Sequence, residues 1–294
     1  MTHPGVEAAC RGNARRLAAT GAFLAIWGVA AAVPLLAQSS STFWYVLWCR
    51  RTYALTGAAG RTVAWFSLAL FVSGVVLAGW TFLRGVLAAY RLNRQFSLLA
   101  APPPPHVLAA ARAAGVAERF LYVAQPQSVA LTLGLFRPLV ILSAGAAEGL
   151  TEGELSAVLL HEAAHCRSRD PLRHLLWSAL VKGFGLLPGF PATARAARSC
   201  AELQADDLAV RRLNSTDALA HALLKMARRT ADLRATPASA GFHDELVLRA
   251  RHLVGQDVSG AILPMATKRP VPWFMWLTGL LALLSLLLPA CLPR

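Results

Sequence analysis

The sequence predicts a mainly α, α+β fold in an integral membrane protein with about three transmembrane helices and one domain that contains a small β-sheet. Of the 294 residues, 56% are hydrophobic and only 15% are charged, whereas soluble domains carry about a quarter charged residues. Three uncharged apolar runs are each long enough to cross a bilayer. Between the second and third runs, the chain shows short β-branched segments and capped helical patterns, as a folded domain does.

The apolar runs divide the chain into seven parts. These are a basic tail at 1–16, transmembrane helices at 17–37, 62–83 and 272–290, a loop at 38–61, the domain at 84–271 and a tail at 291–294. The first run is longer than the apolar core of most signal peptides, and no clear cleavage site follows it. We therefore expect an uncleaved anchor, with a cleaved signal peptide as the alternative.

The domain at 84–271 begins with a stiff linker at Pro102–Pro105. Short strands are expected near 120–124, 129–133 and 139–143, and helices near 106–117, 193–213, 216–235 and 243–254. The apolar segment 174–190 contains Lys182 and is short for a full span. We expect it to be an interfacial or core helix, with a membrane crossing as the alternative.

The net charge of +14 has two possible causes. Basic proteins often bind nucleic acid, but here the arginines are scattered and no nucleic-acid motif accompanies them. A bilayer with anionic lipids is the expected partner instead, and nucleic acid is not. The basic flanks of 84–271 favour a cytoplasmic position for this domain.

The five cysteines form no CxxC pair and no even-numbered framework, so a disulfide scaffold is not expected. Cys166 and Cys200 lie near the chemically informative motifs. Either could be imagined as a metal ligand, but burial as a small apolar residue is the expected state.

The pattern H-E-x-x-H, formed by His161, Glu162 and His165, indicates a zinc site. Thr151 and Glu154 form a capping-box pattern, which predicts that the motif lies on a helix. Residues four apart share a helix face, so both imidazoles can bind one Zn²⁺ while Glu162 accepts a proton from the water that the metal activates. A catalytic zinc needs a third protein ligand, and Glu202 in the sequence E-L-Q-A-D can supply it.

From about Leu121 to Leu213 the chain resembles bacterial membrane metallopeptidases of the beta-lactam sensor/antirepressor type. The resemblance lies in the segments G-L-F-R-P (134–138), L-T-E-G-E-L (150–155), H-E-A-A-H-C-R-S-R-D-P (161–171) and E-L-Q-A-D-D (202–207). The CAAX prenyl and heat-shock membrane proteases share H-E-x-x-H and E-x-x-A-D more distantly. The sensor members carry a penicillin-binding domain that this sequence lacks, so beta-lactam sensing by this chain is not expected.

The resemblance implies a gluzincin-type fold in a multi-pass protein of the bacterial inner membrane. His161, His165 and Glu202 would bind one Zn²⁺, and Glu162 would act as general base. Asp206 is similar to the carboxylate that orients a ligand histidine, with Asp207 and Asp170 as alternatives. The strand at 129–133 would pair with an extended substrate. The oxyanion stabiliser is not identifiable; His174, Arg211 and His221 are candidates by residue type.

The leading hypothesis is therefore a membrane zinc endopeptidase that cleaves a protein at the cytoplasmic face. The substrate would be a repressor or other regulator, or a membrane protein in quality control. A catalytically silent signalling or scaffold protein is the alternative, and the presence of Glu162 argues against it. A transporter is not expected, because the three apolar runs contain no ionisable residue. The oligomeric state is not predicted.

Overall fold

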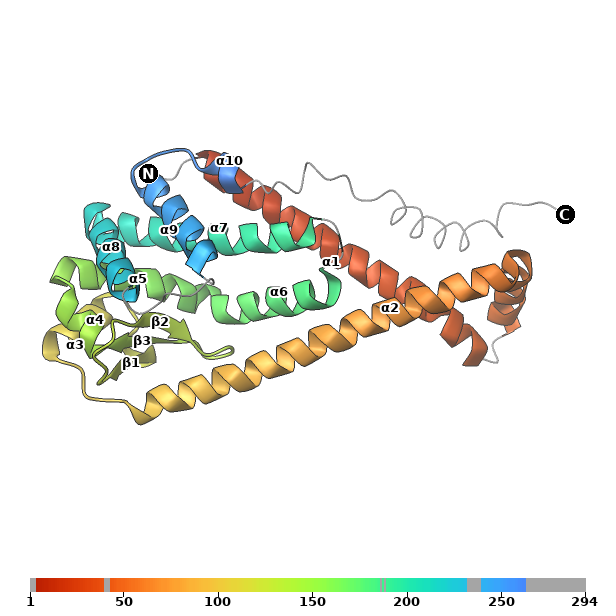
Figure 1. Ribbon diagram of the computed structural model, residues 1–294, viewed down its shortest axis with the longest axis horizontal. Helices are drawn as coiled ribbons and strands as arrows, with labels where there is room; N and C mark the ends of the chain where they lie inside the picture. The colour runs from red at the N-terminus through yellow and green to blue at the C-terminus, as the bar shows by residue number, and fades with distance from the viewer. Residues whose placement is uncertain (1–3, 40–42, 186, 188, 232–238, 263–294) are drawn as a thin grey trace. The chain divides into compact units, whose positions relative to one another are not determined.

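The computed structural model describes residues 4–39, 43–185, 187, 189–231 and 239–262; within them, only the backbone is described for 29–65, 67 and 229–244 (Figure 1). The described chain forms two compact units. The first comprises residues 4–12, 82–178 and 195–262, and the second comprises 13–81 and 179–194. All the candidate site residues belong to the first unit.

The described structure is mainly helical. Its helices are α1 (Pro4–Ser39), α2 (Phe43–Leu98), α3 (Pro105–Ala113), α4 (Ala144–Gly149), α5 (Glu152–Ser168), α6 (Asp170–Phe184), α7 (Phe190–Leu213), α8 (Asp217–Ala231), α9 (Ser239–Leu253) and α10 (Ser259–Ile262), with a 3₁₀ turn at Ala117–Arg119. The helix expected at 174–190 is thus observed, but it starts and ends earlier in the chain, as α6.

The long helices differ from the expected membrane layout. Residues 43–61 were predicted to lie in a loop, but they form the first part of α2, since this segment has no proline to interrupt a helix. Within the described residues, one segment is long and apolar enough to span a bilayer, Leu68–Leu98, and it overlaps the predicted span at 62–83. The predicted span at 17–37 lies in α1, partly without described side chains, and that at 272–290 lies outside the described residues. Three spans are therefore not confirmed.

The predicted small sheet is present. Strands β1 (Phe120–Val123), β2 (Ala130–Leu133) and β3 (Leu139–Ser143) lie in the order β1-β3-β2, with β3 parallel to β1 and antiparallel to β2. The central strand β3 is buried along almost its whole length, as its continuous apolar sequence requires. Gly134, with φ of +92°, supplies the left-handed conformation that turns the chain after β2.

Helix α5 is the structural centre of the first unit. Thr151 and Glu154 form the predicted capping box, which fixes its first residue. Leu155, Leu159 and Ala163 are almost wholly buried in a core that includes residues of β3, α3 and α8. Because this core holds α5 on several sides, the side chains of the next turn have defined positions.

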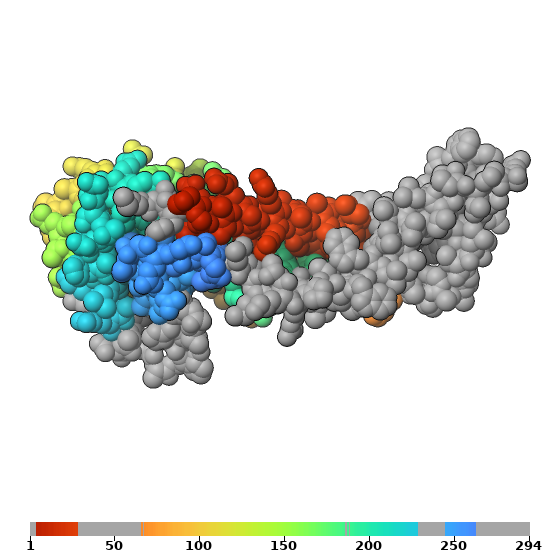
Figure 2. Space-filling view, turned by 90° about the horizontal axis from the view of Figure 1, so that it is seen from above, coloured from red at the N-terminus to blue at the C-terminus, as the bar shows by residue number. Residues whose placement is uncertain are grey.

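A second cluster of buried residues joins the start of α1 to α7 and α10. It contains Val6, Ala9, Cys10, Ala196, Cys200, Leu203, Val258 and Ile262, and Figure 2 shows the first turns of α1 beside the blue C-terminal helices. Within it, Cys10 and Cys200 form a disulfide with a Cα–Cα distance of 5.7 Å. The sequence did not predict this pair, because 190 residues separate the two cysteines. Cys166 is buried with a free thiol, as expected.

The second unit is held by aromatic contacts. The ring of Phe71 lies 5.3 Å from Trp27 and 5.8 Å from Phe184, measured between centroids. Such tilted and edge-on arrangements are favoured for aromatic pairs. Asn13 also donates a hydrogen bond of 3.0 Å to the carbonyl of Thr193. These contacts connect α1, α2 and the segments around residues 184 and 193 within this unit.

Candidate metal centre and active site

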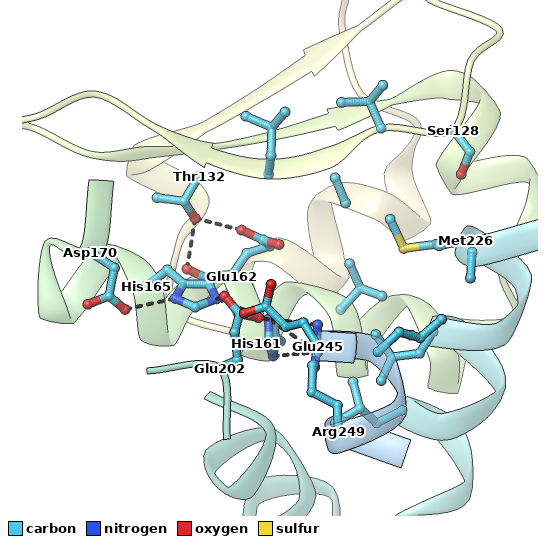
Figure 3. A pocket seen from close by; sticks show the side chains of 18 of the residues that line it. Ser128, Thr132, His161, Glu162, His165, Asp170, Glu202, Met226, Glu245 and Arg249 are labelled. Carbon is cyan, nitrogen blue, oxygen red and sulfur yellow. Dashed lines mark hydrogen bonds and ion pairs between the residues drawn. The ribbon is translucent and has the colours of Figure 1, made fainter. Parts of the chain in front are cut away.

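Three predicted ligand side chains converge on one point. His161 and His165 lie one turn apart on α5, and Glu202 approaches them from α7 (Figure 3). The Nε2 atoms of the two histidines are 3.0 Å apart. Glu202 Oε2 lies 3.5 Å from Nε2 of His161, and Glu202 Oε1 lies 3.5 Å from Nε2 of His165. Glu202, which is 37 residues after His165 in the sequence, thus forms a compact set of donors with the two histidines.

These separations fit a tetrahedral zinc site. With metal–ligand distances of about 2.0–2.2 Å, ligand atoms on a tetrahedron lie about 3.3–3.6 Å apart. The observed separations of 3.0, 3.5 and 3.5 Å are close to this range. Two imidazoles and one carboxylate are also the donor set of catalytic zinc sites that keep a fourth position open. The residues present therefore fit the ion.

A carboxylate lies behind each histidine. Asp206 Oδ1 is 2.9 Å from Nδ1 of His161, and Asp170 Oδ2 is 2.8 Å from Nδ1 of His165. A proton on Nδ1 satisfies each carboxylate and leaves the Nε2 lone pair facing the centre, so these contacts favour the ligating tautomer. Of the three aspartates considered from the sequence, two make this contact. The third, Asp207, instead pairs with His252 at 2.8 Å.

The end of α5 explains how Asp170 reaches His165. Arg169 adopts a left-handed conformation with φ of 52°, which is uncommon for a residue with a side chain. The chain turns there, and α6 begins at the very next residue. Asp170, the first residue of α6, is buried and also accepts a hydrogen bond of 2.9 Å from Arg173. The sequence R-D-P thus positions a buried carboxylate five residues after the second motif histidine.

Arg249 of α9 completes the ring of charges, and sequence analysis did not identify it. Its Nε and Nη2 donate to the two oxygens of Asp206 at 2.8 and 2.6 Å. Its Nη1 lies 3.2 Å from Glu202 Oε2. Helix α9 also carries Arg251, so no local pattern in the sequence distinguishes Arg249 from a surface arginine.

The carboxylates around the centre attract positive charge. Burial and the Arg249 charge oppose protonation of His161, but Asp206 and Glu202 outweigh them and raise its pKa to about 9. Burial likewise opposes ionisation of Glu202, yet the contacts with His161 and Arg249 hold its pKa well below the usual range. The pKa of Asp206 is lowered despite its burial, chiefly by the charge of Arg249. Ionised carboxylates at this position are what a cation site requires.

The motif glutamate is held by the sheet. Thr132 of β2 donates a hydrogen bond of 2.7 Å to Glu162 Oε2, and its hydroxyl is also 3.1 Å from the Glu162 carbonyl oxygen. Glu162 is buried beside the two histidines, as Figure 3 shows. A carboxylate so fixed beside a metal centre has the position of a general base.

A cleft of about 560 Å³ opens over the centre. One side is the strand β2, which lies at the edge of the sheet; within the described residues, no further strand pairs with it. The side chains of the candidate metal centre line the cleft together with apolar side chains, which are those of Val158, Leu219, Leu223 and Met226. Residues 127–132, which include most of β2, line this side of the cleft.

The three candidates for the oxyanion stabiliser differ in their position relative to the cleft. His174 lines the cleft, and its Nε2 is buried with no hydrogen-bond partner among the described residues; burial lowers its pKa. Arg211 and His221 are exposed and do not line the cleft. Glu245 of α9, which the sequence analysis did not single out, also lines the cleft, and burial followed by the charge of Glu202 raises its pKa.

A family model described as Peptidase family M48 matches residues 96–257, more than half of the chain. The matched region contains the cleft, the metal-binding candidates and the sheet. This match supports a metallopeptidase, but it does not distinguish the sensor/antirepressor type that the sequence resembles. No curated protein and no solved structure matches the chain.

Proposed function

This chain belongs to peptidase family M48, and we propose that it is a membrane-associated zinc endopeptidase that hydrolyses peptide bonds of a protein substrate. The observation that carries the proposal is the convergence of His161, His165 and Glu202, with Glu162 beside them. Membrane association is supported by the apolar helix segment Leu68–Leu98.

In this proposal each residue has a defined task. His161, His165 and Glu202 hold one Zn²⁺, which when bound polarises the scissile carbonyl and acidifies water. Glu162 accepts the proton of the attacking water and delivers it to the leaving amine. Thr132 keeps the Glu162 carboxylate in place through its hydroxyl. His174, whose Nε2 is unpaired at the cleft wall, is the best-placed candidate to donate to the oxyanion.

The substrate is proposed to bind as an added β-strand along β2. Backbone hydrogen bonds to an edge strand recognise any extended peptide, so sequence preference comes from the side-chain pockets. A regulator, as in the sensor/antirepressor enzymes that the sequence resembles, and a membrane protein in quality control are the two substrate classes proposed. The alternative, a silent scaffold, is disfavoured because Glu162, the proposed general base, is present and is held by Thr132.

Two observations bear on the side of the membrane that the peptidase domain faces. The cytoplasmic orientation is a prediction from the arginine distribution. The Cys10–Cys200 disulfide speaks against it, because disulfides persist in oxidising compartments and are rare in the cytosol. Alkylation of free thiols in intact cells, followed by mass analysis, distinguishes the reduced pair of a cytoplasmic domain from the oxidised pair of an external one.

The function is tested with two variants of the full-length protein in detergent or lipid. Glu162→Gln removes the base but no metal ligand, so cleavage of a casein or peptide-library substrate is lost while zinc stays bound. Glu202→Ala removes a ligand, so zinc content falls as well. Full cleavage by Glu162→Gln would disprove the base assignment, and an unchanged zinc content in Glu202→Ala would place the third ligand elsewhere.

A further inference from the structure

We propose that Arg249 is a positioning residue that locks the metal ligands in place, so that tight zinc binding depends on the docking of α9 against α7. This inference rests on the proposed zinc centre, and it assigns a role to a residue outside both sequence motifs. Arg249 touches neither substrate nor metal in this proposal. It acts through Glu202, Asp206 and His161.

The contacts of Arg249 form a chain that ends at a ligand nitrogen. Nε and Nη2 hold both oxygens of Asp206, and Asp206 Oδ1 in turn lies 2.9 Å from Nδ1 of His161. Nη1 reaches the Glu202 carboxylate at 3.2 Å. One guanidinium therefore fixes a ligand directly and a second ligand through one intermediate residue (Figure 3).

Burial makes this arrangement necessary. The Asp206 side chain is completely inaccessible to solvent, so water cannot satisfy its charge. A buried carboxylate without a partner carries a large desolvation cost and is driven to move or to become protonated. Either change would release the ring of His161. Arginine suits this task because its planar fork donates from separate nitrogens in a fixed geometry, whereas a lysine ammonium offers one nitrogen without a fixed orientation.

The positive charge of Arg249 does not by itself favour metal binding. A positive side chain next to a metal centre repels a divalent cation, so simple electrostatics would favour its absence. Its presence here is explained if the ordering of the Asp206 and Glu202 carboxylates outweighs that repulsion. The two effects are separable, because a lysine keeps the charge and loses the fork.

Helix α9 is joined to α7 at two neighbouring points. Arg249 holds Asp206, and one turn later His252 lies 2.8 Å from Asp207. The ligand-bearing face of α7 is thus covered by α9, and the metal centre is complete only when α9 is in place. Any ligand or partner that displaces α9 would then weaken metal binding.

The test measures zinc dissociation from the full-length protein in the Glu162→Gln background, where no self-cleavage interferes. Release is followed with a chromogenic chelator, and the absorption spectrum of the Co²⁺-substituted protein reports ligand geometry. Arg249→Lys is expected to speed zinc loss by about 10- to 100-fold and to alter the spectrum, as loss of a residue that orients a metal ligand does. Arg251→Lys, an exposed arginine on the same helix, is the matched control and should change neither.

Asp206→Asn interrupts the same chain of contacts from the other side and should give a similar acceleration. Combined with Arg249→Lys, it should accelerate release by less than the product of the two single effects, since both disturb His161, whereas only Arg249→Lys also disturbs Glu202. Circular dichroism identifies a variant that fails to fold; if Arg249→Lys does, Arg249→Gln is measured in its place and should also speed zinc loss. Release at the parent rate from a folded Arg249→Lys variant, or from Asp206→Asn, would overturn this inference. Absence of zinc from the parent protein would instead overturn the proposed function.

Discussion

Replacing Thr132 by valine is expected to slow catalysis without removing the metal. The substitution keeps the shape of the side chain and deletes only the hydroxyl, which donates to Glu162 Oε2 at 2.7 Å. Thr132 lies on β2 and is not one of the metal-binding candidates, so the ligand set remains intact. The change therefore isolates how firmly the general base is held.

The size of the effect follows from that hydrogen bond. A hydrogen bond to a charged group contributes about 1.5–3 kcal/mol. If the whole contribution is needed to hold Glu162 in its reactive position, kcat falls by about 10- to 150-fold, since each 1.4 kcal/mol is a factor of ten. KM should stay nearly constant, because the backbone of β2 that is proposed to bind the substrate is unchanged.

The assay compares steady-state cleavage of a fluorogenic peptide by the parent protein, Thr132→Val and Thr132→Ser, with zinc measured in each sample. Thr132→Ser retains the hydroxyl and should recover most of the parent kcat. A Thr132→Val variant with full zinc and parent kcat would show that the contact does not position the base. A rise in KM alone would instead indicate a role in substrate binding.

Two further predictions concern stability. Gly145→Ala should lower the free energy of unfolding by about 1–3 kcal/mol, because the new Cβ would clash with the carbonyl oxygen of Pro126 and must displace that backbone; a parent-like melting temperature would contradict this. Glu154 is buried, which opposes its ionisation, but contacts with Lys225 and Thr151 lower its pKa below 4.5. Its stabilising effect is thus fully present above that pH and is lost as the pH falls through the lowered pKa. Thermal melts between about pH 7 and pH 3 should therefore show a smaller acid-induced loss in Glu154→Gln than in the parent; equal losses would exclude this source of acid sensitivity.

Local patterns in the sequence predicted much of the first unit. The capping box at Thr151 and Glu154 is confirmed, as are the helix that carries H-E-x-x-H and the three short strands. These features depend on residues close together in the chain, which is why composition and spacing reveal them. The spacing of His161 and His165 also correctly predicted a shared helix face.

Contacts between distant segments could not be predicted in the same way. Arg249 meets Asp206 across 43 residues, and Thr132 meets Glu162 across 30. Nothing in the spacing of these residues distinguishes them from surface polar residues. Residues 43–61 were predicted to be a loop and are helical, and this difference has another cause. Aromatic and small residues next to an apolar run occur in helices and in connections alike, so the composition of this segment does not distinguish the two.

The Cys10–Cys200 disulfide limits how the chain can thread through a bilayer. It fastens the residues before Gly12 to the helix that carries Glu202, so both must lie in the same aqueous compartment. The chain leaves the first unit after Gly12 and returns to it at Phe82. In the proposed membrane protein, any crossing of the bilayer between these two points must therefore be matched by a return, so that the number of crossings there is even.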